Sequence, residues 1–180
     1  MDPIVEFASQ AGALLAIAAQ IASVAIVLAL IFKNANLGKR VILFFGTWAL
    51  SLSFLIALGA LAASLFYSEY AGFEPCTLCW YQRIFIYPQV FLLGLGLYKK
   101  DASILRYTIW LSVVGAIIAG YHSLLQFGFV PALPCSAAVV SCTQRFVSLY
   151  GYITIPVMSF AAFVLSVCLA LANRKTERQA

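Results

Sequence analysis

Five almost purely apolar stretches decide most of what this chain can fold into. They are residues 11–32, 41–66, 80–98, 107–127 and 152–172. Each is close to or longer than the ~20 residues that a helix needs to cross the hydrocarbon core of a bilayer. A bilayer offers no water to an unpaired backbone group, so each stretch must be helical. We therefore predict an all-α integral membrane helical bundle with five transmembrane helices.

The composition excludes a soluble globular domain. The 180 residues are 64% hydrophobic and 9% charged, whereas a soluble domain is about half apolar and about a quarter charged. The net charge of +5 does not indicate nucleic-acid binding, because the position of positive charge along a membrane protein matters more than its sum. The lipid bilayer is the expected surrounding, and no nucleic-acid partner is expected.

The N-terminal stretch is better explained as an uncleaved helix than as a signal peptide. The segment before it carries Asp2 and Glu6 and no Lys or Arg, whereas a signal peptide has a basic first region.

The loops predict an orientation. Nine of the 11 basic residues lie after the first stretch, after the third and in the C-terminal tail: Lys33, Lys39, Arg40, Lys99, Lys100, Arg106, Arg174, Lys175 and Arg178. All these segments fall on one side of a five-pass chain. The positive-inside rule then places the N-terminus outside and the C-terminus in the cytoplasm.

This orientation puts four cysteines on the outer side, where disulfides form and persist. Cys76 and Cys79 precede the third stretch, and Cys135 and Cys142 lie in the loop after the fourth. Cys168 lies near the cytoplasmic end of the fifth stretch and is expected to be a buried small hydrophobic residue.

A Cys-x-x-Cys pair can be half of a zinc site, a structural disulfide or a redox dithiol. A structural zinc needs four ligands, and all four outer cysteines would be required. The six residues between Cys135 and Cys142 and the oxidising side of the membrane both count against zinc, so no metal is expected.

The string "EPCTLCWYQR" favours the redox dithiol. Pro75 suits the first turn of a helix, and the partial positive charge of a helix N-terminus favours a thiolate. Arg83 lies four residues beyond Cys79, one turn deeper on the same face. An arginine inside an apolar stretch is costly and usually functional, although it can also extend outward to lipid headgroups.

The fourth stretch contributes His122, the single histidine of the chain. It is predicted at about the depth of Arg83, with Gln126 one turn above it, so Arg83 and His122 can line one polar pocket under the outer surface. A hydrogen-bonded contact between helices is an equal alternative for His122. The Cys135 and Cys142 pair is either a stapled loop or an exchange dithiol presented to a soluble partner.

An exchange dithiol must pass its electrons on. The sequence has no recognisable pattern for flavin, haem or an iron–sulfur cluster. The pair lies at the lipid interface, where a lipid-soluble acceptor such as a quinone can reach it. Arg83 can stabilise charge on a quinone oxygen, and His122 can donate a hydrogen bond or manage protons.

Four segments carry a family resemblance: "CTLCWYQR" (residues 76–83), "GYHSLLQ" (120–126), the loop with Cys135 and Cys142, and "YGYITIPVMSF" (150–160). In these segments the chain resembles the DsbB family of bacterial disulfide-bond formation proteins, especially its BdbC-like branch. The resemblance implies a domain organisation of an extra N-terminal transmembrane helix and cytoplasmic loop (1–40), a four-helix core (41–172) and a cytoplasmic tail (173–180).

The resemblance also implies a quinone-dependent protein-thiol oxidase of the bacterial inner membrane. Cys76 and Cys79 would be the membrane-proximal dithiol, with Cys79 next to ubiquinone or menaquinone. Cys135 and Cys142 would be the loop pair, with Cys135 forming the mixed disulfide. Arg83, His122 and Gln126 would bind the quinone. The partner would be a thioredoxin-fold dithiol oxidase of the DsbA or BdbD type.

Two alternatives stay open. The same scaffold can work in the reducing direction, as in quinone or epoxide reductases, or it can be a non-enzymatic membrane protein stapled by disulfides. The role of helix 11–32, the direction of electron flow, the quinone and the oligomeric state do not follow from the sequence.

Overall fold

The computed structural model describes residues 2–131 and 141–178. Within this part the chain is helical, with one isolated antiparallel bridge between Leu149 and Ile153. The α-helices are α1 (Pro3–Ile31), α2 (Asn36–Thr47), α3 (Ala49–Leu65), α4 (Thr77–Lys99), α5 (Leu105–Gln126) and α6 (Ile155–Glu177). A π-helical turn, Phe66–Tyr70, prolongs α3, and a 3-10 turn, Ala102–Ile104, precedes α5. The predicted all-α membrane bundle is confirmed.

Within the described residues, four helices are long and apolar enough to cross a membrane. They are Pro3–Ile31, Ala49–Tyr70, Ala102–Gln126 and Ile155–Glu177. α4 has 23 residues, which is sufficient length for a crossing. It is not one of the four, and its polar Gln82, Arg83 and Gln89 lower its mean hydropathy.

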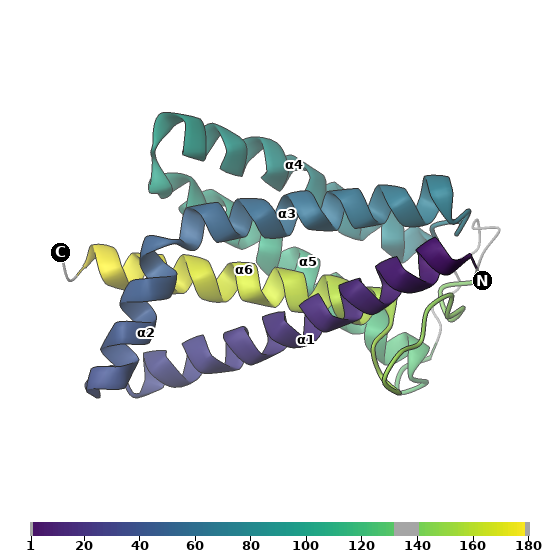
Figure 1. Cartoon of the computed structure of the whole chain (residues 1–180), viewed down its shortest axis with the longest axis horizontal. Coiled ribbons are helices and arrows are strands. Elements are labelled where there is room, and N and C mark those ends of the chain that lie inside the picture. Colours follow the sequence, from purple (N-terminus) through teal and green to yellow (C-terminus); the bar gives the residue numbers. More distant parts are fainter. Residues whose placement is uncertain (1, 132–140, 179–180) are drawn as a thin grey trace.

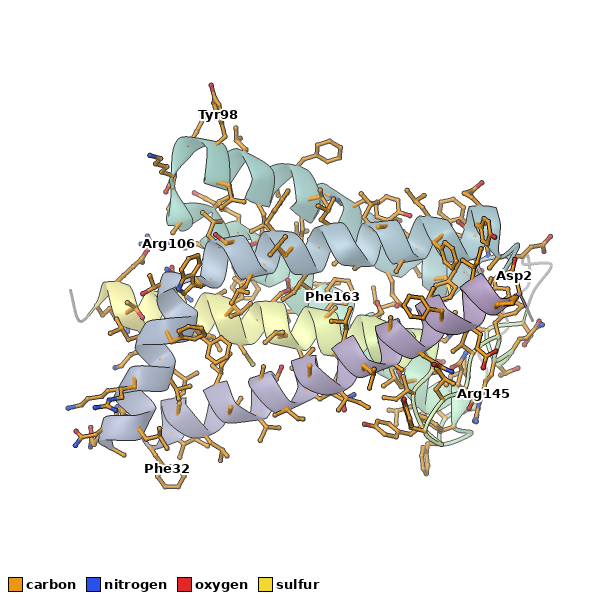
Figure 2. The ribbon with its side chains drawn as sticks, in the orientation of Figure 1. Asp2, Phe32, Tyr98, Arg106, Arg145 and Phe163 are labelled. Carbon is orange, nitrogen blue, oxygen red and sulfur yellow. The ribbon has the colours of Figure 1, made fainter. Side chains whose placement is uncertain are left out.

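The helices pack around α6. It contacts α5, α1, α2 and α3, while α4 packs against α3 and α5. Figure 1 shows α1, α3, α5 and α6 running roughly along the long axis of the molecule. Phe163 on α6 is fully buried in the centre and is labelled in Figure 2. Its ring lies directly over Gly115 of α5, where a Cβ atom would overlap it.

The second apolar stretch is not one helix, as the sequence predicted, but two. The break falls at Trp48, between α2 and α3, and Figure 1 shows α2 crossing the ends of α1 and α6. Asn173 of α6 donates from Nδ2 to the carbonyl oxygen of Gly46 at 3.2 Å. This bond satisfies one of the carbonyls that a helix end leaves unpaired. The break thus depends on contacts with α6, which local sequence does not reveal.

The two ends of the bundle differ in charge. The C-terminus, α2 and the α4–α5 connection lie at one end, and the N-terminus with the α3–α4 and α5–α6 connections lies at the other (Figure 1). The nine basic residues of the loops and tail belong to segments at the first end. Arg106 and Glu177 form an exposed ion pair there, with 3.4 Å between Nη2 and Oε2. We call the second end, which contains Cys76, the outer end, after the orientation that the loop charges predict.

Candidate functional site

Cys76 and Cys79 lie at the start of α4. Cys76 is the N-cap residue, in extended conformation, and its carbonyl oxygen accepts from the backbone N–H of Trp80 at 3.1 Å. Cys79 is the third residue of the helix. The sequence predicted Pro75 in the first turn of the helix, but Pro75 precedes the N-cap residue. Both sulfurs remain beside the positively polarised helix N-terminus, which favours a thiolate.

The two cysteines are not equivalent. Cys76 is buried and Cys79 is half-buried. Cys76 donates a hydrogen bond to the sulfur of Cys79 at 3.4 Å. This bond, together with burial, raises the pKa of the Cys76 thiol to about 11. Cys76 therefore keeps its proton at neutral pH, and the sulfur of Cys79 accepts the hydrogen bond that this proton makes.

His122 lies between the cysteine pair and the loop that follows α5. Its Nδ1 is 3.0 Å from Nε2 of Gln82 on α4. Its Nε2 is 3.8 Å from the sulfur of Cys76 and 3.1 Å from the carbonyl oxygen of Cys142. With the amide nitrogen of Gln82 donating to Nδ1, the proton of the neutral ring sits on Nε2 and points to Cys142 and Cys76. The imidazole is fully buried.

Cys142 lies against the cysteine pair. It is buried and packs with Cys76 and Leu125 in one small cluster, with Cys79 at its edge. Cys135, its predicted redox partner, lies outside the described residues. The structure therefore brings Cys76, Cys79 and Cys142 to one place.

A small cavity adjoins these groups. Its volume is about 30 Å³, and its lining includes Cys76, Cys79, His122, Gln126 and Phe146. The side-chain oxygen of Gln126 is buried and has no hydrogen-bond partner among the described residues. A cavity of this size holds a water molecule or two, and it is too small for a quinone ring.

The end of α5 is fixed by the loop after Cys142. Gln126 donates from Nε2 to the carbonyl oxygen of Gln144 at 2.9 Å. Arg145 donates from Nε to the carbonyl oxygen of Gln126 at 3.0 Å, and from Nη2 to the same oxygen. A cation at a helix C-terminus is electrostatically favourable. These bonds hold the segment that carries Cys142 against α5; Figure 2 shows Arg145 at the outer end.

Arg83 faces a different neighbour from His122. Its Nη2 donates to the carbonyl oxygen of Ser64 on α3 at 3.1 Å, and its guanidinium lies 5.0 Å from the centre of the Trp80 ring. Arg83 is half-buried, and Trp80 is 54% exposed. The described residues that line the cavity include His122 and Gln126 but not Arg83. Arg83 thus faces α3, and the structure does not bring it into the one pocket with His122 that the sequence predicted.

The extra helix α1 reaches the site through a row of aromatic rings. Phe146, which lines the cavity, stacks on Phe73 with 4.8 Å between ring centres, and Phe73 stacks on Tyr67 at 5.8 Å. The hydroxyl of Tyr67 donates to Oγ of Ser9 on α1 at 3.2 Å. α1 therefore buttresses the outer loops beside the cysteine pair.

A family comparison agrees with this arrangement. The family model described as "Disulfide bond formation protein DsbB" matches residues 46–173. The chain belongs to the DsbB family. As a member of this family it is a multi-pass membrane protein of disulfide bond formation. The match begins inside α2, so α1 lies outside the part that the DsbB family model describes.

Several named relatives are similar to this DsbB-family chain. "Disulfide bond formation protein C" of Bacillus subtilis is 36% identical over 144 residues, which are 77% of this chain and 99% of the relative. "Probable disulfide formation protein C" of Halalkalibacterium halodurans is 40% identical over 114 residues, 63% of this chain and 83% of the relative. The "SPbeta prophage-derived disulfide bond formation protein B" of Bacillus subtilis is 46% identical over 114 residues, 63% and 77% of the two chains. No solved structure matches the chain significantly.

The sequence reasoning missed Gln82. Its side chain is buried and holds His122 in place. The available signal was its polarity: an amide inside an apolar helix needs a partner, just as Arg83 does. The role of Phe146 had no such signal, because one more aromatic residue in an apolar chain looks like core.

Proposed function

We propose that this protein is a quinone-dependent thiol oxidase that reoxidises a thioredoxin-fold dithiol partner on the outer side of the bacterial inner membrane. The observation that carries the proposal is the packing of Cys142 against Cys76 beside a single buried imidazole. Two cysteine-bearing segments, far apart in sequence, meet where a thiolate of one can attack a disulfide of the other. The names of the relatives, which refer to disulfide formation, support the same chemistry.

Thiol–disulfide exchange accounts for the electrons and protons. The partner's two thiols become a disulfide, with Cys135 forming the mixed disulfide, and the Cys135 and Cys142 pair becomes two thiols. That pair then reduces a Cys76–Cys79 disulfide, and the two electrons and two protons move to these sulfurs. With its ring proton on Nε2, His122 is placed to donate a hydrogen bond to a thiolate that forms beside it at Cys76.

Quinone fits the Arg83 side of α4 better than the cavity. The cavity is too small for a ring, whereas Arg83 lies beside the exposed Trp80 and Ile84. Arg83 has five N–H donors, of which one is bound to Ser64. A cationic donor flanked by apolar side chains suits a quinone oxygen. A bound ubiquinone or menaquinone supplies an acceptor for two electrons and two protons from the Cys79 side.

The test is turnover of the purified protein with a reduced thioredoxin-fold partner and quinone, followed by quinone absorbance. The wild type should reduce quinone in step with partner oxidation, and Cys79→Ser should abolish it. Arg83→Gln should raise the KM for quinone by tenfold or more, since it removes a charged donor worth about 1.5–3 kcal/mol. Cys168→Ser is the matched control, because this cysteine is buried in α6 towards the other end. Undiminished turnover in Cys79→Ser would overturn the proposal.

A further inference from the structure

The reduced cysteine pair and His122 form a compact set of soft ligands. The two sulfurs are 3.4 Å apart, and Nε2 of His122 is 3.8 Å from the sulfur of Cys76. All three ligand atoms lie within 4.8 Å of one another. Two thiolates and an imidazole are the donors that Zn²⁺ and similar thiophilic ions select. The set differs from the four-cysteine site considered from the sequence, because His122 comes from another helix.

The spacing suits a tetrahedral ion. Bonds of about 2.3 Å to sulfur and 2.0–2.1 Å to nitrogen place two sulfurs about 3.8 Å apart, and a sulfur and a nitrogen about 3.6 Å apart, in a tetrahedral zinc site. The observed separations of 3.4 Å between the sulfurs and 3.8 Å from the Cys76 sulfur to Nε2 differ from these values by about 0.4 Å or less. The separation from the Cys79 sulfur to the imidazole is at most 4.8 Å, so it needs to shorten by about 1.2 Å at most to match the same geometry.

The surroundings supply the other parts of a metal site. Gln82 contacts Nδ1 of His122 and so fixes the ring, as outer partners of metal-bound histidines do. Metal at Nε2 requires the ring proton on Nδ1, which the amide oxygen of Gln82 can accept after the amide turns over. The adjoining cavity of about 30 Å³ has room for a water at the fourth position. When Nε2 binds the ion, His122 would lose its hydrogen bond to the carbonyl oxygen of Cys142.

We propose that the reduced protein binds one thiophilic divalent ion, with Zn²⁺ as the representative, through Cys76, Cys79 and His122. Binding forms two metal–sulfur bonds and one metal–nitrogen bond, and the two thiols release two protons; no electrons are transferred. Oxidation to the Cys76–Cys79 disulfide removes both thiolate ligands, so the site exists in one redox state alone. The ion blocks reoxidation of the pair, a consequence that rests on the proposed function, whereas the binding itself does not.

The experiment is a titration of the full-length protein in detergent, reduced and free of quinone and partner, with Co²⁺. One equivalent should produce thiolate-to-cobalt charge-transfer absorption, and Zn²⁺ should abolish it by competition. Prior oxidation of the pair should prevent it. Cys76→Ser and His122→Ala should weaken binding by 100-fold or more, and Gln82→Leu by about 10- to 100-fold.

Two controls keep the outcome decisive. Cys168→Ser should bind as the wild type does, and circular dichroism should show that the His122 variant is folded; if it is not, Gln82→Leu provides the comparison. A Cys135→Ser, Cys142→Ser double variant should keep the absorption, whereas its loss would show a four-cysteine site and overturn the proposal. Absence of charge-transfer absorption in the reduced wild type would also overturn it. Because no turnover is measured, either failure is distinguishable from failure of the thiol-oxidase proposal.

Discussion

At the scale of single residues, the site depends on how one buried imidazole is held. His122 has a polar partner on each side, Gln82 at Nδ1 and the Cys142 carbonyl at Nε2. A buried polar group without a partner costs about 1–3 kcal/mol, so the amide both stabilises the ring and selects its orientation. Gln82 thereby acts on Cys76 through His122 and is a positioning residue.

We expect Gln82→Leu to lower kcat for the partner dithiol by about tenfold, since the ring loses the bond that aims Nε2, worth about 1–1.5 kcal/mol. The KM for quinone should stay unchanged, because Arg83 faces α3 and does not contact His122. Steady-state kinetics with each substrate varied in turn measure both quantities.

The matched control is Gln89→Leu. Gln89 is also a buried amide of α4, but it bonds to Phe85 and Ser112, away from the cysteines. This variant should lower thermal stability and leave kcat unchanged. Equal losses of kcat in the two variants would mean that Gln82 contributes stability alone.

Helical spacing predicts how far along their helices Arg83 and His122 lie, but not the direction in which their side chains point. Arg83 and His122 were both assigned to about one turn below the outer surface from the helical rise per residue. Successive residues of a helix differ by about 100° around its axis. Gln82 therefore faces α5 and His122, while Arg83 faces α3 and Ser64. Whether Gln82 or Arg83 contacts His122 depends on how α4 packs against α3 and α5. This packing cannot be predicted from the pattern of the sequence alone.

At the scale of elements, the helices were predictable where hydropathy and local signals agree. The stretches 107–127 and 152–172 correspond closely to α5 and α6, since charged residues and loop signals flank them. The stretch 41–66 does not, because the break at Trp48 is stabilised from α6. A Cβ at Gly46 would collide with Thr176, so the close approach of α2 and α6 requires this glycine. The hydropathy pattern of one segment does not predict a contact such as this one between α2 and α6.

The attachment of α1 to the outer loops gives an element-level prediction. Tyr67→Phe removes the hydroxyl that binds Ser9 of α1, at a cost of about 1 kcal/mol. If Cys76 reacts through local opening of the loops, this loss of about 1 kcal/mol makes the opening easier by the same amount. Alkylation of Cys76 in the reduced protein should then become about fivefold faster. Mass spectrometry after timed N-ethylmaleimide treatment measures the rate at Cys76.

The comparison variant is Tyr152→Phe, which removes an exposed hydrogen bond between Tyr152 and Gln20 of α1. Exposed bonds contribute little, and this one does not adjoin the aromatic row from Tyr67 to Phe146. Alkylation of Cys76 should keep its wild-type rate. Faster alkylation of Cys76 in Tyr152→Phe, or an unchanged rate in Tyr67→Phe, would show that the aromatic row does not transmit the support of α1.

At the scale of the whole molecule, charge and redox chemistry are separated along the bundle axis. Cys76 is the N-cap residue at the start of α4, and the basic loop and tail segments lie at the opposite end of the bundle (Figure 1). Asp101 there accepts from the backbone N–H of Ser103 at 2.9 Å, and bonding to Ser103 lowers the pKa of that carboxyl. It therefore stays ionised among basic neighbours. This separation is what the positive-inside rule requires if the cysteine end faces outward.

The final prediction is the orientation itself, tested by cysteine labelling from outside intact cells or spheroplasts. Glu74→Cys, at the cysteine end, should react with a membrane-impermeant maleimide before lysis, whereas Lys100→Cys should react only after permeabilisation. Both residues lie in connections between helices, next to opposite ends of α4. The two substitutions therefore also test whether α4 crosses the membrane despite its lower hydropathy. Labelling of both from outside would contradict a crossing by α4, and the reverse pattern would contradict the orientation, since the dithiol would then face the reducing cytoplasm.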